Sequence, residues 1–188
     1  MTKFAAPSPP YLGPANRYSP GGNKPITRIT LHSTVGPTKA GSARAIAAYF
    51  RWTDRPASAH YVVDAAEVVQ VVFDGDTAYH APPNAHSIGV EMCDNPSPTN
   101  ILRWFDRDHR AMLKLTARLV AELCLAYDVP AEFRKADALR AGGHGVTTHA
   151  QVSKAWGQTT HWDPGAWPRR RFMRQVRRQI RAIKAGKR

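Results

Sequence analysis

The chain has 188 residues, of which 43% are hydrophobic, enough for one compact domain with a core. The chain has 27 Lys and Arg residues and 14 Asp and Glu residues, for a net charge of +13. Ten of the basic residues lie in residues 169–188, which contain no acidic residue. Residues 1–168 therefore carry a net charge of only +3. Two cysteines, Cys93 and Cys124, are too few for a disulfide framework and lack zinc-knuckle spacing. Proline interrupts the first residues, so we expect no secretory signal, no transmembrane segment and synthesis in the cytoplasm.

The first half of the chain predicts a sheet with one helix. Residues 1–25, rich in proline and glycine, are expected to form a surface lead-in that does not pair with the central sheet. The β-branched run from Ile26 predicts a strand ending near His32, and Ser42 predicts the cap of a helix that ends before Asp54. Short apolar runs at 59–64, 67–73 and 87–92 predict three further strands, so the sheet has about four.

The second half predicts two helices around a long loop. Apolar residues recur at helical spacing over 106–127, and Val129-Pro130 ends this helix. Residues 140–165 lack periodicity and are expected to form a loop over the sheet edge. A narrow apolar stripe from Phe172 to Ile183 predicts a basic C-terminal helix. The expected divisions are a lead-in at 1–25, a catalytic domain at 26–168 and the basic helix at 169–188.

Eight histidines make a metal site the first chemical hypothesis, because imidazole is the commonest metal ligand. A catalytic zinc site takes three nitrogen, oxygen or sulfur ligands from the protein and leaves one position open. His32 closes a strand, His149 lies in a loop, and Asp163 is held before a Pro-Gly turn in HWDPG. Their spacing alone does not show that they meet, and His144 is an alternative second ligand.

Six short motifs occur in an order that resembles one family. They are LHST at 31–34, SAHYVVD at 58–64, AYHA at 78–81, HSIGVEM at 86–92, THAQVS at 148–153 and HWDPG at 161–165. Over Ile26 to Trp167 the chain resembles the zinc-dependent N-acetylmuramoyl-L-alanine amidases, the amidase-2 family, whose fold is shared with peptidoglycan recognition proteins and whose phage members are endolysins. The resemblance implies a single α/β domain with a mixed central β-sheet flanked by helices.

The resemblance also implies a role for each motif residue. One zinc ion would bind His32, His149 and Asp163; the AQVS that follows His149 matches the family and favours it over His144. Glu91 corresponds to the catalytic glutamate that moves a proton, and His161 would donate a hydrogen bond to the oxyanion. The chain departs from the family pattern at two places. It has an insertion, KAWGQTT, before Asp163, and it has Ala59 where some branches of the family carry a tyrosine.

Other residues have competing structural and functional interpretations. His60 fits a cleft wall, and His80 fits a substrate contact or a partner of a ligand. Trp162, like Trp156 and Trp167, either lines a substrate groove or anchors a loop. Glu91 has the alternative of a salt bridge to an arginine, while His86 and His109 are expected to be exposed and without a role.

The implied function is a zinc hydrolase that cleaves the amide between N-acetylmuramic acid and L-alanine in peptidoglycan. The expected partners are the stem peptide and muramic acid, and the expected biology is a phage lysin made in the host cytoplasm that acts on the cell wall after release. The basic C-terminus has three interpretations: a solvated helix face, a surface for anionic cell-envelope polymers, or a nucleic-acid site. Two alternatives for the whole chain are a non-catalytic peptidoglycan-binding module and a nucleic-acid-binding protein. The second alternative leaves the six motifs unexplained.

Overall fold

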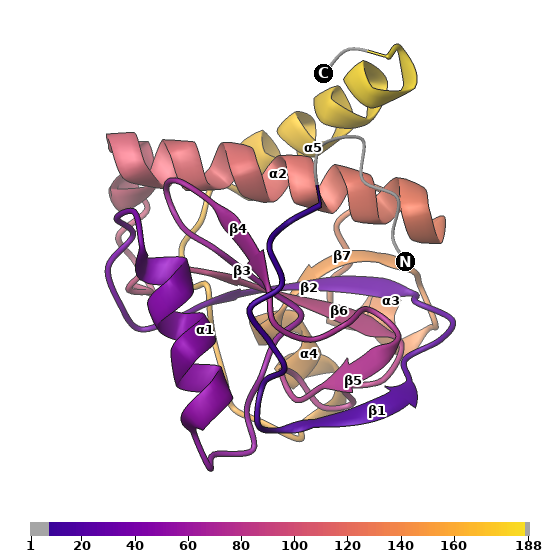
Figure 1. Ribbon diagram of the computed structural model, residues 1–188. Coiled ribbons are helices and arrows are strands. Elements are labelled where there is room, and N and C mark those ends of the chain that lie inside the picture. Colours follow the sequence, from indigo (N-terminus) through magenta and orange to yellow (C-terminus); the bar gives the residue numbers. More distant parts are fainter. Residues whose placement is uncertain (1–7, 187–188) are drawn as a thin grey trace.

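The computed structural model describes residues 8–186, and Figure 1 shows its helices and strands. Expectations for residues 1–7 and 187–188 lie outside this part of the chain. The elements are, in chain order, β1 Tyr18–Gly22, β2 Arg28–Ser33, α1 Ser42–Trp52, β3 Tyr61–Val63, β4 Val68–Gln70, β5 Asp76–Ala78, β6 Ser87–Met92, the 3-10 helix η1 Leu102–Phe105, α2 Arg107–Tyr127, α3 Ala136–Arg140, β7 Gly145–Thr148, α4 His149–Trp156 and α5 Arg169–Lys184.

The central sheet has five strands in the order β4-β3-β6-β2-β7. Strand β2 runs parallel to both β6 and β7, β3 runs parallel to β6, and β4 alone is antiparallel, to β3. Every residue of β2 is buried, as expected of a parallel strand covered on both faces. Because β2, β6 and β7 are parallel, their carboxyl ends meet at one edge of the sheet.

Helices cover both faces of the sheet, as Figure 1 shows. Helix α2 lies across the upper face and contacts four strands, with α5 packed on its outer side. Helix α4 lies below the sheet against β2 and β7, and α1 flanks β3 and β4. This confirms the expected mixed α/β architecture. Among residues 8–186 no helix is both long and apolar enough to cross a membrane.

The long helix and the strands lie close to their predicted positions. Helix α2 begins after Asp106, whose side chain accepts a hydrogen bond from the backbone NH of His109 at its first turn. Strand β6 matches the predicted 87–92. Helix α1 begins at Ser42 itself, with Gly41 rather than Ser42 at the cap position, so the predicted serine cap is wrong.

The expectation of a loop over 140–165 is wrong. Residues 145–148 form β7, the fifth strand and an edge of the sheet, and residues 149–156 form α4. Both are shorter than the window over which periodicity is visible in a sequence. The lead-in adds no full strand to the central sheet, but Tyr11 forms a parallel bridge with Gln70 of β4, so the expectation that it does not pair there is wrong. Its Tyr18–Gly22 pairs with β5 in a separate two-stranded sheet.

Candidate metal centre

The site residues come from the carboxyl ends of neighbouring parallel strands. His32 is the penultimate residue of β2, and His149 directly follows β7 as the first residue of α4. The register pairs Leu31 with Thr148, so the two histidines leave their strands at the same level. The parallel register also pairs His32 with Glu91 of β6, and register partners point to the same face of a sheet.

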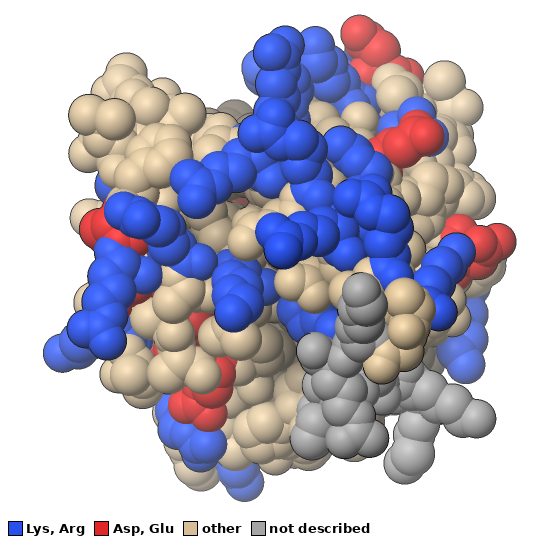
Figure 2. All heavy atoms as spheres, turned by 90° about the horizontal axis from the view of Figure 1, so that it is seen from above, with Lys and Arg blue, Asp and Glu red and all other residues tan. Residues whose placement is uncertain are grey.

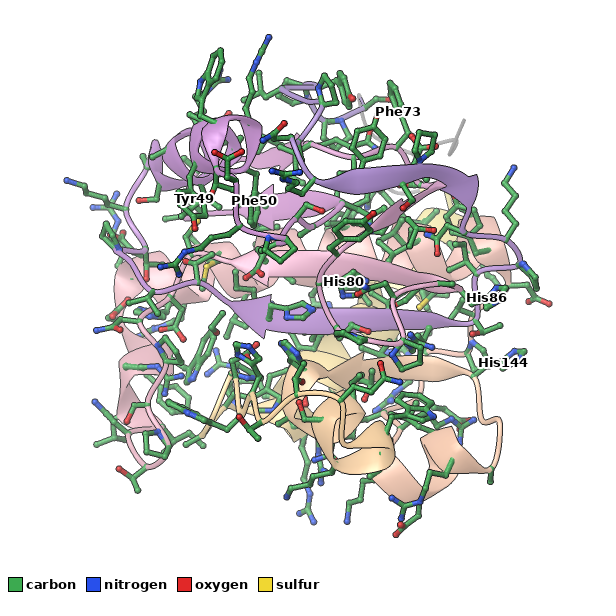
Figure 3. All side chains as sticks on the ribbon, turned by 90° about the horizontal axis from the view of Figure 1, so that it is seen from below. Tyr49, Phe50, Phe73, His80, His86 and His144 are labelled. Atoms are coloured by element: carbon green, nitrogen blue, oxygen red, sulfur yellow. The ribbon has the colours of Figure 1, made fainter. Side chains whose placement is uncertain are left out.

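Three of the side chains converge. Nδ1 of His32 lies 3.1 Å from Nδ1 of His149, and the two carboxylate oxygens of Asp163 lie 3.4 and 3.3 Å from these same nitrogens. One ligand atom from each residue lies within 4.8 Å of the others. The structure therefore brings His149 to His32 and Asp163, whereas His144 is exposed and lies apart from His80, the site histidine that Figure 3 labels.

Electrostatics keep His32 and Asp163 in the forms that bind a cation. Burial lowers the pKa of His32 to about 4, so its imidazole is neutral near pH 7. Burial alone would raise the pKa of Asp163, but hydrogen bonds from His149 and His32 outweigh it and hold that pKa well below its usual range. The neutral imidazole of His32 and the carboxylate of Asp163, with the imidazole of His149 beside them, form a ligand set of zinc.

The imidazoles of His32 and His149 each contact a second polar group through Nε2, the ring nitrogen that faces away from the cluster. Nε2 of His32 lies 3.0 Å from Nδ1 of His80, and Nε2 of His149 lies 3.2 Å from Oγ1 of Thr159. These contacts leave Nδ1 of both ligands directed into the cluster. Gly89 makes room for the His80 ring, since a Cβ at that position would lie 2.6 Å from it. Outer hydrogen bonds of this kind fix the ring orientation of metal-ligating histidines.

A tight turn holds Asp163 in place. The backbone NH of Gly165 donates to the carbonyl of Trp162, and that of Ala166 donates to the carbonyl of Ser97. Gly165 has a φ of 69°, and a Cβ there would lie 2.3 Å from the Ser97 oxygen, so the position requires glycine. The Pro-Gly after Asp163 therefore forms a tight turn, as the sequence predicts.

The partly buried Arg103 holds the same turn in place as a clamp. Arg103 donates at 2.8 Å to the carbonyls of both Pro164 and Ala166, and its guanidinium forms an ion pair with Asp94. Asp94 also accepts a hydrogen bond from Ser33, the neighbour of His32. The clamp thus joins the strand end that carries one candidate ligand to the turn that carries another.

His109 completes this clamp, so the expectation that it is exposed and without a role is wrong. Its side chain is only 12% exposed and lies 2.9 Å from Asp94 and 2.7 Å from Asp106. No sequence pattern indicated this role, because Asp94, Arg103 and His109 lie outside the six motifs, and the clamp also depends on distant contacts with Ser33 and Ala166. Thr159, inside the inserted KAWGQTT, was missed for the same reason.

Glu91 lies beside the cluster without a partner of its own. Its Oε2 is shielded from solvent and has no hydrogen-bond partner among the described residues. Burial raises the pKa of Glu91 well above its usual range, and the charge of Asp163 raises it further. The alternative of a salt bridge to an arginine is not found among the described ion pairs, which leaves this carboxyl group free for chemistry.

These groups open into a cleft of about 430 Å³. Besides the three candidate ligands, Glu91 and Thr159, the cleft is lined by His80, His161 and Trp162. The His161 ring stacks on His149 with a centroid distance of 4.4 Å, and the indole of Trp162 is half-exposed at 49%. A ligand in the cleft would therefore meet an exposed imidazole and an exposed aromatic face next to the cluster.

His60 does not line the cleft. Its ring is fully buried, accepts a hydrogen bond from the backbone of Gly89 and contacts the side chain of Asn23. We therefore assign it a structural role and propose no substrate contact for it.

Two of the tryptophans are also absent from the cleft lining. Arg28 lies over Trp156, while Trp167 packs against Phe133 and Phe172. Of the two interpretations of the tryptophans, Trp156 and Trp167 fit anchors and Trp162 fits a groove wall.

Comparison with known proteins identifies the family. The model of the amidase-2 family, described as N-acetylmuramoyl-L-alanine amidase, matches residues 22–166. The chain belongs to this family. A curated relative from Bacillus licheniformis, described as a "Probable N-acetylmuramoyl-L-alanine amidase", is 33% identical over an alignment of 136 residues, and the match covers 62% of this chain. It covers 36% of that protein, so the chain spans little more than a third of its length.

Solved structures share the fold. Staphylococcus aureus hydrolase AmiA, in complex with its ligand, aligns with a TM-score of 0.68 and 18% identity over 97% of this chain and 87% of that one. A mutant endolysin from Bacillus subtilis aligns with a TM-score of 0.60 and 22% identity over 90% of this chain and 98% of that one. The expected family and the expected fold class are both confirmed.

Proposed function

We propose that this chain is a zinc-dependent hydrolase that cleaves the amide between N-acetylmuramic acid and L-alanine in peptidoglycan. One observation carries the proposal: His32, His149 and Asp163 converge on one point beside the shielded, unpartnered carboxyl of Glu91. Two imidazoles and a carboxylate, with His80 and Thr159 behind the imidazoles, fit a single zinc ion. When bound, the ion supplies Lewis acidity that polarises the amide carbonyl and lowers the pKa of water.

The residues around this position have complementary tasks. Glu91 takes a proton from the water that attacks the carbonyl carbon and returns it to the nitrogen as the C–N bond breaks, so the amine leaves neutral. Its raised pKa suits a group that must both accept and release a proton. His161, exposed at the cleft rim, donates a hydrogen bond to the oxyanion that forms. Trp162 offers a flat apolar face to the glycan or the stem peptide.

We also propose a phage lysin that is made in the host cytoplasm and acts on the wall after release. The family membership and the fold shared with the Bacillus subtilis endolysin support this origin. The family's substrate supports the stem peptide and muramic acid as partners.

The test is mass spectrometry of purified peptidoglycan after digestion with and without added zinc. We expect new L-alanine amino termini and free muramic acid carboxyl groups, lost with a chelator and restored by zinc. Glu91→Gln keeps the shape of the side chain and should lower turnover about 100-fold or more while zinc stays bound. The exposed Glu132→Gln is the matched control. Full activity of Glu91→Gln would refute the assignment of the general base, and wall binding without new amino termini would favour a non-catalytic module.

A further inference from the structure

Helix α5 carries a dense positive charge that the cleft chemistry does not use. It has eight Arg and Lys residues and no acid, and no ion pair of theirs occurs within residues 8–186. Figure 2 shows the result, a face covered by Lys and Arg with acidic groups at its margins. Such a concentration of unpaired charge raises the local concentration of anions.

The charge surrounds a groove. Two hollows of about 640 and 670 Å³ adjoin, since Phe133 and the arginines at 169, 170 and 174 line both. Lys135 and Arg177 extend the wall on one side. The one acid in the lining, Asp137, is already paired with Arg140. No described residue lines both this groove and the metal cleft, so the two can be occupied independently.

The shape of the groove favours a chain-like anionic partner over a membrane surface. The apolar residues Phe172, Met173 and Val176 of α5 are buried, and α5 packs on α2, so these residues cannot insert into a bilayer. A concave site also suits a narrow flexible chain better than a flat membrane.

The aromatic rings of the groove are already engaged within the protein. The Arg169 guanidinium lies 4.9 Å from the Phe133 centroid, and Trp167 packs between Phe133 and Phe172. Single-stranded nucleic acid binds with its bases stacked on free aromatic faces, whereas Phe133 and Trp167, which line this groove, are only partly exposed and already contact other side chains. The remaining interaction is repeated pairing of arginine with phosphate.

We propose that this groove binds a linear phosphodiester polymer of the bacterial envelope, one without bases. Arginines along one side of a helix meet successive phosphates, and each contact releases counterions, so binding weakens steeply with salt. The interaction goes beyond the proposed hydrolysis and does not depend on it. It would hold the protein on the wall while the cleft remains open.

Fluorescence anisotropy with labelled poly(glycerol phosphate) tests the proposal on the full chain, without a hydrolysis readout. The groove variant is K135Q/R170Q/R174Q, whose three side chains are exposed and have no ion pair or hydrogen bond within the described residues. The matched control is K39Q/R51Q/R55Q, which removes the same charge from exposed positions around α1. Circular dichroism of both variants verifies the fold.

We expect the groove variant to bind about tenfold or more weakly at 0.1 M salt, with the slope of log affinity against log salt reduced by about 2. The control should change affinity by less than about twofold, since its cations lie outside the groove. Equal losses in both variants, or unchanged binding by the groove variant, would overturn the proposal. Tighter binding of single-stranded DNA or of phosphatidylglycerol vesicles than of the polymer would overturn it as well.

Discussion

Two buried polar clusters lie side by side at the carboxyl edge of the sheet, and both contain histidine and aspartate. In one, Asp94 receives hydrogen bonds from Ser33, Arg103 and His109, so its charge is fully matched by the protein. In the other, two imidazoles point their Nδ1 atoms at each other and at Asp163. Buried polar groups are normally satisfied within the fold. The difference fits a structural role for the Asp94 cluster and supports the proposal of a cation site at the His32 cluster.

The sharpest test of this difference is His32→Ala. Removing a ligand should weaken zinc binding by more than the about 100-fold typical of outer hydrogen-bond partners, because one of three protein ligands is gone. The free energy of unfolding of the metal-free chain should fall less than it does when the Asp94 cluster is broken. Competition with a chromophoric chelator gives the affinity, and urea denaturation gives the stability.

His144→Ala is the matched control, since this histidine is exposed and lies apart from His80 in Figure 3. It should bind zinc as tightly as the unmodified protein. Loss of zinc in His144→Ala together with retention in His32→Ala would show that the cluster is not the metal site.

Arg103→Met should have the opposite pattern. It leaves Asp94 buried beside His109 without its guanidinium partner and should lower the free energy of unfolding by about 3–5 kcal/mol. Zinc affinity should fall less than in His32→Ala, because the variant removes no ligand and only loses the hydrogen bonds to the carbonyls of Pro164 and Ala166 beside Asp163. Urea denaturation of the metal-free protein measures the first effect. Arg107→Met, at an exposed position on α2, should be neutral, and an equally stable Arg103→Met would mean that the clamp is not structural.

The sequence predicted the fold where a pattern extends over many residues or matches a motif. Helix α2 shows a helical period over 21 residues, and the apolar residues of β6 are dense enough to indicate a buried strand. Strand β7 and helix α4 were missed because four and eight residues are too few for a period to appear. Only tertiary contacts with β2 and α3 give these segments their structure.

The same limit applies to the site. His32, His149, Asp163 and Glu91 were recognisable because each lies in a short motif. Thr159, Arg103 and His109 lie outside the six motifs, and no local sequence pattern indicates the contacts that they make. Sequence therefore indicates which groups face the ligand more readily than which groups hold them in position.

Thr159→Val tests the support behind the metal cluster. Valine keeps the shape of threonine but removes the oxygen 3.2 Å from Nε2 of His149, so the ring loses its orientation. Zinc affinity should fall about 10-fold or more, with little change in unfolding by urea. Thr160→Val, one residue along and exposed, should leave the affinity unchanged. Equal affinities for both variants would exclude Thr159 as an orienting group.

His109→Gln should have the smallest effect and gives the structural cluster a pH signature. Burial lowers the pKa of His109, but contacts with Asp94 and Asp106 outweigh it, so the folded-state pKa lies above the ordinary 6.5. The charged contacts therefore stabilise the fold fully below pH 6.5 and lose their contribution as pH rises through the folded-state pKa.

The measurement is urea denaturation of the metal-free protein at pH 5.5 and pH 9. His109→Gln should cost about 1 kcal/mol more at pH 5.5 than at pH 9, a modest value because Asp106 is half-exposed and screened by solvent. His144→Gln, which removes an exposed imidazole, should show no such difference. A pH-independent cost in His109→Gln would mean that the ring contributes by packing against Trp104, with which it makes an edge contact, and not by charge.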